Sequence, residues 1–411
     1  MTWRTPFTAL LTVPASLALL IGAAGVGLAM AERLYGTPAW LGALDAEAVR
    51  TILSVVATSA MTALSLAYSL TLVVFTLAAS SIGPRLLKRF TTERANQVTA
   101  GLLGGTFLFA LAGLGFGGEE PARIAALGAG VLAVASVVQL IWFVRTVAQS
   151  VSVDDELAKI AARLERDLKR LRENSEDGGL PAPATFRPLA ATAESGYLAR
   201  LDRKGLVALS EKAGVVLKVE RTAGDYLFPD TPVISVSDEV SPDIREKLSA
   251  TVRQEPARSD AGTVHFSMNL LVEIALRALS PGVNDTFTAL AVCDMLSGAL
   301  AGVSRSTPRL EAIRDTRGNV RVILPGASIE ELLDEAYHPL RRAAASNILM
   351  AEGLARAYQR LFASGHAGTR RALREHARLL LADLARVGHA ETDIGSVSEL
   401  MPGPAGRTVN S

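Results

Sequence analysis

Charge, cysteine and catalytic motifs are all scarce in this chain of 411 residues. Only 20% of the residues are charged, and 42 basic residues nearly balance 41 acidic ones. A near-neutral chain has no overall field to attract a phosphate backbone, so we expect no nucleic-acid partner. The single cysteine, Cys293, excludes an internal disulfide and fits a reduced compartment.

Motifs of the common enzyme classes are missing as well. We find no phosphate loop, dinucleotide fingerprint, zinc-ligand spacing or nucleophile elbow. Cys293 lies in an apolar run, where a buried and inert thiol is expected rather than a nucleophile. The sequence therefore predicts no enzymatic reaction, no cofactor and no metal site.

Apolar residues, by contrast, make up 49% of the chain and gather in four long runs that contain no Asp, Glu, Lys, Arg or His. A helix that crosses a bilayer needs roughly 20 largely apolar residues. We therefore predict an α-helical transmembrane domain over residues 1–148, with spans at residues 5–31, 51–84, 95–118 and 124–144. Because no span carries an ionisable residue, a proton-coupled transporter is disfavoured.

Basic residues in the short loops predict the orientation, because Lys and Arg resist translocation. Arg145 follows the fourth span, and four basic residues follow the second, namely Arg85, Lys88, Arg89 and Arg94. The other two loops carry at most two basic residues each, accompanied by acids. The sequence predicts a multi-pass protein with both termini in the cytoplasm.

Small residues four positions apart predict close helix packing inside the membrane. The pairs are Gly101/Gly105, Gly113/Gly117, Ala18/Gly22 and Ala126/Gly130. The second span also carries hydroxyl groups along one helical face. As candidate membrane-pathway residues we take Ser54, Thr58, Thr62, Ser65 and Ser69. The alternative, that these hydroxyls bond back to their own helix or hold helices together, stays open.

A mixed α+β cytoplasmic domain, mostly helical, is expected to follow the spans. Its predicted parts are an amphipathic helix and linker (149–190), a small β-rich module (191–240), a helical region with a hairpin near 309–324 (241–390) and a disordered tail (391–411). The amphipathic helix either forms an oligomer seam or packs on its own domain. Within the module, Gly224–Leu227 and Thr231–Ile234 resemble the hairpin of biotinyl-type and lipoyl-type barrel domains, but no lysine stands at the tip. We expect a structural, barrel-like module.

A predicted helix from His265 to Leu279 carries polar side chains at four-residue steps, and the turn after it is expected to need a positive φ at Gly282. Together they suggest a ligand pocket whose candidate residues are His265, Asn269, Glu273, Arg277, Ser280, Asn284 and Asp285. Such a pocket could meet a cation, or hold an anion on the amides after Asp285. The structural alternative is a Glu273–Arg277 pair followed by a capped turn.

Farther along, Pro339 is expected to break or kink a helix that begins near Ser328. Arg341, Arg342 and His338 then form a local basic group. This group either faces a phosphate or is an ordinary solvated helix face.

The segment from Ala275 to Ala289, with the core Ser-Pro-Gly-Val-Asn-Asp at Ser280–Asp285, carries a resemblance. With the four spans and the Gly-Asp turn at Gly224, it resembles the bacterial predicted membrane proteins catalogued as domain of unknown function 2254. The resemblance covers nearly the whole chain, although Thr286 stands where that family is expected to have proline. It implies a place in the bacterial inner membrane and no assigned reaction.

Two functions remain open on this basis. The first is a channel-like or transport-related homo-oligomer in the lipid bilayer, with a cytoplasmic regulatory domain. The second is a membrane-anchored sensor or scaffold that binds a ligand or protein partner through that domain. The sequence names no ligand.

Overall fold

The computed structural model describes residues 6–38, 40, 45–82, 94–116, 122–150, 153–173, 185–190, 194–256, 258, 263–303 and 310–402. The chain forms two compact units, Met1–Val153 and Asp154–Ser411, called here the membrane unit and the C-terminal unit. The predicted linker and the basic loop after the second span lie largely outside the described residues.

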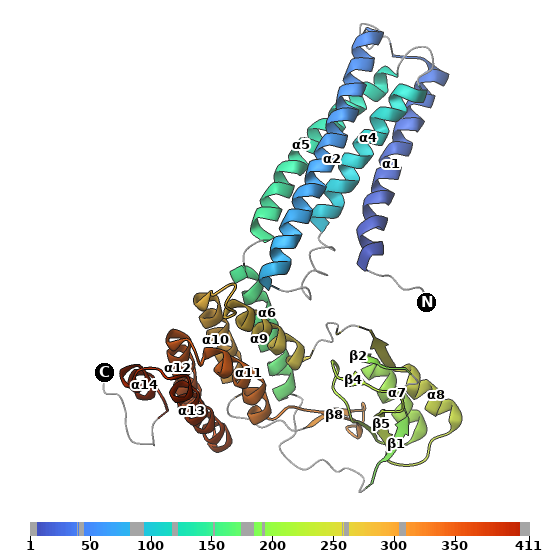
Figure 1. Cartoon of the computed structure of the whole chain (residues 1–411). Helices are drawn as coiled ribbons and strands as arrows, with labels where there is room; N and C mark the ends of the chain where they lie inside the picture. The colour runs from blue at the N-terminus through green and yellow to red at the C-terminus, as the bar shows by residue number, and fades with distance from the viewer. Residues whose placement is uncertain are drawn as a thin grey trace. The chain divides into compact units, whose positions relative to one another are not determined.

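The membrane unit is a bundle of four long apolar helices, shown in blue to teal in Figure 1. They are α1 (Pro6–Tyr35), α2 (Ala46–Ile82), α4 (Arg94–Phe116) and α5 (Arg123–Ser150). Each contains a stretch long and apolar enough to cross a membrane, at Thr12–Tyr35, Ala46–Thr76, Arg94–Phe116 and Arg123–Val147. The four predicted spans are thereby confirmed as long apolar helices, and α4 packs against each of the other three.

Glycines bring α1 and α4 into backbone contact. A Cβ added at Gly105 would lie 2.7 Å from Ile21, and one added at Gly25 would lie 2.9 Å from the Phe109 backbone. Gly101 meets Leu17 in the same way. Close approach of this kind is how helices associate where lipid removes the hydrophobic driving force. Of the predicted small-residue positions, Gly130 is different, because nothing lies within 4 Å of the added Cβ.

Polar groups inside the bundle are paired between helices. Thr106 on α4 and Ser136 on α5 lie with hydroxyl oxygens 3.1 Å apart, and the Gln139 amide donates to the Thr99 hydroxyl at 2.9 Å. At one end, the buried Glu32 carboxylate accepts hydrogen bonds from the backbone N–H groups of residues 123 and 124 at 2.9 and 2.8 Å. A carboxylate at a helix N-terminus satisfies free N–H groups and suits the helix dipole.

Helices dominate the C-terminal unit. The amphipathic helix α6 (Val153–Glu173) buries its apolar face, including Leu157 and Leu164, and Arg172 donates to the carbonyl of Gly302 at 3.1 Å. The apolar face of α6 therefore packs on its own chain. The other helices of this group are α9 (Val264–Ala278), α10 (Thr286–Ala301), α11 (Ile329–Ala344), α12 (Ile348–Ser364), α13 (Ala367–Val387) and α14 (Glu391–Glu399).

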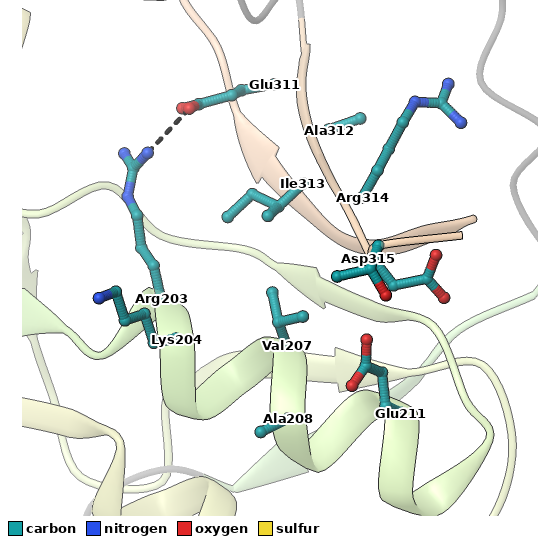
Figure 2. A pocket seen from close by; sticks show the side chains of 11 residues that line it. Arg203, Lys204, Val207, Ala208, Glu211, Glu311, Ala312, Ile313, Arg314 and Asp315 are labelled. Atoms are coloured by element: carbon teal, nitrogen blue, oxygen red, sulfur yellow. Dashed lines mark hydrogen bonds and ion pairs between the residues drawn. The ribbon is translucent and has the colours of Figure 1, made fainter. Parts of the chain in front are cut away.

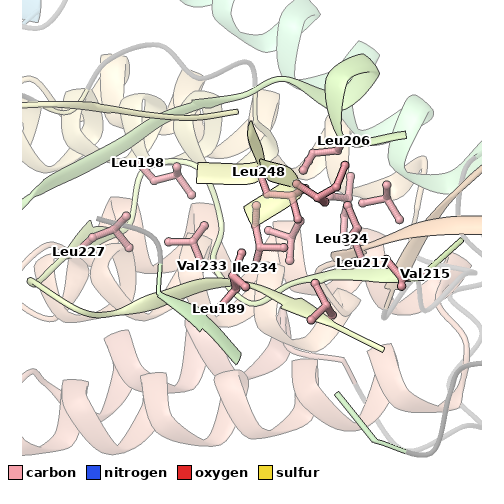
Figure 3. Close-up of a cluster of buried hydrophobic side chains, with 14 residues drawn as sticks. Leu189, Leu198, Leu206, Val215, Leu217, Leu227, Val233, Ile234, Leu248 and Leu324 are labelled. Atoms are coloured by element: carbon pink, nitrogen blue, oxygen red, sulfur yellow. The ribbon is translucent and has the colours of Figure 1, made fainter. Parts of the chain in front are cut away.

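Two small sheets complete the C-terminal unit. A three-stranded sheet has the order β4 (Tyr226–Leu227), β2 (Gly196–Leu201), β6 (Val252–Glu255). A five-stranded sheet has the order β1 (Arg187–Ala190), β5 (Pro232–Val236), β3 (Leu217–Val219), β8 (Val320–Pro325), β7 (Leu310–Arg314). With α7 (Arg203–Ala213) and α8 (Pro242–Ala250), they enclose the aliphatic core shown in Figure 3, which includes Leu198, Leu206 and Leu217.

Three sequence-based expectations need correction here. The barrel-like module is wrong, because β4 pairs with β2 whereas β5 pairs with β1 and β3, so the expected hairpin is divided between two open sheets. Pro339 does not end its helix, since α11 continues to Ala344 and a new N-cap forms at Asn347. The tail is ordered as far as α14, where Val397 is fully buried.

Candidate functional site

The predicted ligand-pocket residues separate into two groups at opposite ends of α9. His265 and Asn269 lie in its first half, whereas Ser280, Asn284 and Asp285 lie in the turn beyond its last residue. Asn269 and Ser280, the nearest members of the two groups, are eleven positions apart, which is roughly 16 Å along a helix axis, so a small ligand does not reach both groups. Glu273 and Arg277 lie between them, half-buried and each engaged in an interaction of its own.

Glu335 on α11 contacts both members of the first group, and no pattern in the sequence indicated it. Glu335 Oε2 lies 2.5 Å from His265 Nδ1. The other carboxylate oxygen, Oε1, accepts a hydrogen bond from the Asn269 amide at 2.5 Å. The hydrogen bond to Glu335 raises the pKa of His265 above its ordinary value, although burial works in the opposite direction. This three-residue cluster joins α9 to α11.

The second group lies in a turn whose geometry corrects the expected role of Gly282. Asn284, with φ of 50°, adopts the left-handed conformation, and Gly282 does not. The backbone N–H groups of Val283 and Asn284 both donate to the Ser280 carbonyl, at 3.0 and 2.9 Å. Asn is the residue besides glycine that most readily adopts this conformation. The turn therefore depends on the backbone of Asn284.

Asp285 caps α10, as predicted. One of its carboxylate oxygens accepts from the Thr288 N–H at 3.1 Å and the other from the Thr288 hydroxyl at 2.6 Å. These hydrogen bonds lower the pKa of Asp285. Its carboxylate is thus occupied by the helix it begins.

The hydroxyl stripe of α2 faces away from the other three helices of the bundle. Ser54, Thr58, Thr62, Ser65 and Ser69 are all exposed. Thr58 donates to the Ser54 carbonyl and Thr62 to the Thr58 carbonyl, both at 2.8 Å. Donation to the helix backbone uses the hydroxyl proton and leaves the oxygen lone pairs directed outward as acceptors. Thr58 and Thr62 consequently present acceptors to whatever covers this face of α2.

A groove of about 610 Å³ lies between α7 and the β7–β8 hairpin, and sequence reasoning did not find it. Figure 2 shows the side chains that line this groove. Its floor is apolar, with Val207, Ala208 and Ile313, and its rim is charged. Arg203 donates to the largely buried Glu311 at 2.8 Å across one end. The groove combines residues more than a hundred positions apart, so no local pattern could reveal it.

At the other end of the groove, Asp315 closes the hairpin. Burial works to raise its pKa, but hydrogen bonds from Asn319, Arg321 and the Arg317 N–H outweigh it and hold the pKa at about 2. Asp315 is therefore an ionised, structural carboxylate. The rim residues not committed to the hairpin turn include Lys204 and Glu211.

The predicted basic group on α11 does not form one surface. Arg341 is buried and pairs with Asp383 on α13, which also pairs with Arg386. Arg342 is exposed, and His338 lies beside Asp334. Cys293 is buried, as expected, and this burial raises the pKa of its thiol to about 12. It is not a nucleophile at neutral pH.

Comparison with known proteins places the chain among membrane proteins. The family described as Predicted membrane protein (DUF2254) matches residues 4–360. Two uncharacterized proteins, from Mycobacterium bovis and Mycobacterium tuberculosis, are 26% identical over 320 residues, which cover 71% of this chain. The chain spans about 60% of the length of these curated relatives. No solved structure matches it.

Proposed function

The chain belongs to the family Predicted membrane protein (DUF2254), and from this premise we propose that it acts as a channel-like or transport-related homo-oligomer in the bilayer. In this proposal the membrane unit builds the assembly, the C-terminal unit regulates it, and the chain catalyses no reaction. Both termini lie in the cytoplasm, in keeping with the basic loop after the second span.

The outward direction of the hydroxyl stripe carries the proposal. Glycine packing between α1 and α4 and the buried hydroxyl pair of Thr106 with Ser136 occupy the interior of the described bundle. A wet path is therefore better placed between copies of the chain than within one copy. Ser and Thr are enriched where membrane helices meet, and hydroxyl oxygens with outward lone pairs suit water or a permeating ion.

Mass measurement in detergent and recording in planar bilayers test this proposal together. We expect particles several times the 43.3 kDa chain mass and a conductance that Ser65→Phe reduces. Val131→Phe is the matched control, because Val131 on α5 is 70% exposed and lies outside the stripe. A monomer without conductance would refute the proposal.

A membrane-anchored sensor or scaffold is the second candidate, and the groove of Figure 2 favours it. An apolar floor with a charged rim suits a short peptide segment of a protein partner, since the floor supplies affinity and the rim supplies specificity. This candidate predicts that Val207→Glu abolishes partner binding and leaves the particle mass unchanged. Loss of oligomers in that variant would instead tie the groove to assembly.

A further inference from the structure

We propose that Asp334, His338 and His376 form a binding site for a divalent transition-metal cation of the zinc class, which would join α11 to α13. His376 Nε2 lies 3.0 Å from Asp334 Oδ1, and His338 Nε2 lies 3.3 Å from the same oxygen. One ligand atom from each of the three residues lies within 4.8 Å of the other two. The proposal stands apart from the channel-like function and does not depend on it.

Two of the three separations among these atoms match what a metal requires. Ligands about 2.1 Å from a tetrahedral zinc ion lie roughly 3.4 Å apart from one another. The two nitrogen–oxygen separations, 3.0 and 3.3 Å, are already close to that value. Two imidazoles and one carboxylate are also a donor set that zinc and its neighbours in the first transition row prefer over magnesium or calcium.

Packing holds the least accessible ligand in position. The His376 side chain is 2% exposed, and its ring lies beside Tyr337 and Tyr358, with centroid distances of 6.1 and 5.9 Å. The His338 ring is 4.5 Å away. A ligand whose orientation is fixed by its surroundings loses little freedom when the metal binds, which favours affinity.

The tautomers of the two histidines matter for metal binding. Nδ1 of His338 and Nδ1 of His376 are buried and have no hydrogen-bond partner among the described residues. A partner at Nδ1 is what usually fixes the tautomer of a histidine. Each Nε2 lies beside the Asp334 carboxylate, which can only accept, so in the metal-free chain the rings donate Nε2–H to it. A cation would bind Nε2 once these protons have moved to Nδ1, because a metal ligand must be deprotonated.

Solvent reaches the site from one side. The side chain of Asp334 is 55% exposed and that of His338 is 35% exposed. A metal held by three protein ligands on this open side keeps a coordination position for water or for a fourth donor. Binding would fasten α11 and α13 together, because Asp334 and His338 belong to one helix and His376 to the other.

Titration of the full chain with Zn²⁺ tests the site. The protein is purified in detergent through a tag without histidine, stripped with a chelator and titrated by calorimetry, and its melting temperature is measured with and without Zn²⁺. We expect one high-affinity equivalent per chain and a higher melting temperature with Zn²⁺. Asp334→Asn and His338→Gln should weaken binding by more than about tenfold, the cost of disturbing even the hydrogen bonds around a metal ligand.

Variants outside the cluster and a second metal complete the test. His366→Gln with His389→Gln removes two of the five histidines but no proposed ligand, so binding should persist. Mg²⁺ should neither compete nor raise the melting temperature. Absence of a high-affinity equivalent in the native chain would overturn the proposal, as would a double Asp334→Asn, His338→Gln variant that binds Zn²⁺ as tightly as the native chain.

Discussion

In the membrane unit the hydroxyl stripe of α2 faces outward, whereas in the C-terminal unit two charged groups of α11, Glu335 and Arg341, bind partners on neighbouring helices. The bundle is held by close backbone packing, which needs small residues and no charge. The C-terminal helices are held by apolar burial and by specific ionic contacts to α9 and α13. A single bundle therefore offers few charged groups to an ion, whereas the C-terminal unit offers the cluster of Asp334, His338 and His376.

The largest expected effect concerns the buried ion pair of α11 and α13. Asp383→Ala leaves Arg341, which is 6% exposed, without this carboxylate, and an uncompensated buried charge costs about 3–5 kcal/mol. Chemical denaturation of the full chain, followed by a signal from the C-terminal unit, measures the loss. Glu375→Ala is the control, because its pair with Arg378 is solvent-exposed on the same helix. If both variants lost the same stability, the buried ion pair would not be a special source of stability.

The second prediction concerns the α1–α4 contact. Gly25→Ala places a Cβ 2.9 Å from the Phe109 backbone, and overpacking of this kind costs about 1–3 kcal/mol. Gly27→Ala on the same helix meets nothing within 4 Å and should be tolerated. Thermal stability in detergent compares the two. If Gly27→Ala is the more damaging variant, the packing of this bundle is not as described.

A smaller effect is expected at the turn between α9 and α10. Asn284→Ala must adopt a positive φ, which costs roughly 1–2 kcal/mol, whereas Asn284→Gly should be neutral. Gly282→Ala should be tolerated, because its added Cβ meets nothing within 4 Å. Melting of the three variants distinguishes a conformational role from a ligand role. A destabilised Asn284→Gly variant would show that the side chain, rather than the backbone, matters.

The smallest expected effect is a dependence on pH at His265. Glu335 raises the pKa of His265 in the folded chain, so the stabilisation by this pair is fully present below the unfolded value of 6.5. It is lost as the pH rises through the higher folded pKa. The difference in melting temperature between the native chain and His265→Gln should therefore shrink with rising pH. A difference that stays constant or grows would contradict the ion pair.

Periodicity and composition sufficed for much of the fold, because hydropathy marks a membrane helix over its whole length and alternation marks a strand locally. They predicted the four spans, a β-rich module over residues 191–240 and the hairpin on either side of Asp315. They could not predict that β8 pairs in parallel with β3, since Leu217 and Val322 are more than a hundred positions apart.

The candidate sites show the same limit. Glu335 contacts His265, and His376 contacts His338, in each case from a different helix. No local spacing in the sequence predicts either contact. The only local signal was the four-residue step from Asp334 to His338, which a routine ion pair also produces. The absence of a zinc-ligand spacing therefore did not exclude a metal site assembled by tertiary packing.

Cross-linking of single cysteines tests the central claim, that copies of the chain meet along the outward face of α2, most directly. In a Cys293→Ser background, cysteine replaces Ser65 in the stripe or Val131 on the exposed face of α5, and native membranes are treated with a short thiol-reactive linker. We expect cross-linked dimers for the Ser65 position and few or none for the Val131 position. Equal cross-linking at both positions, or none at Ser65, would contradict it.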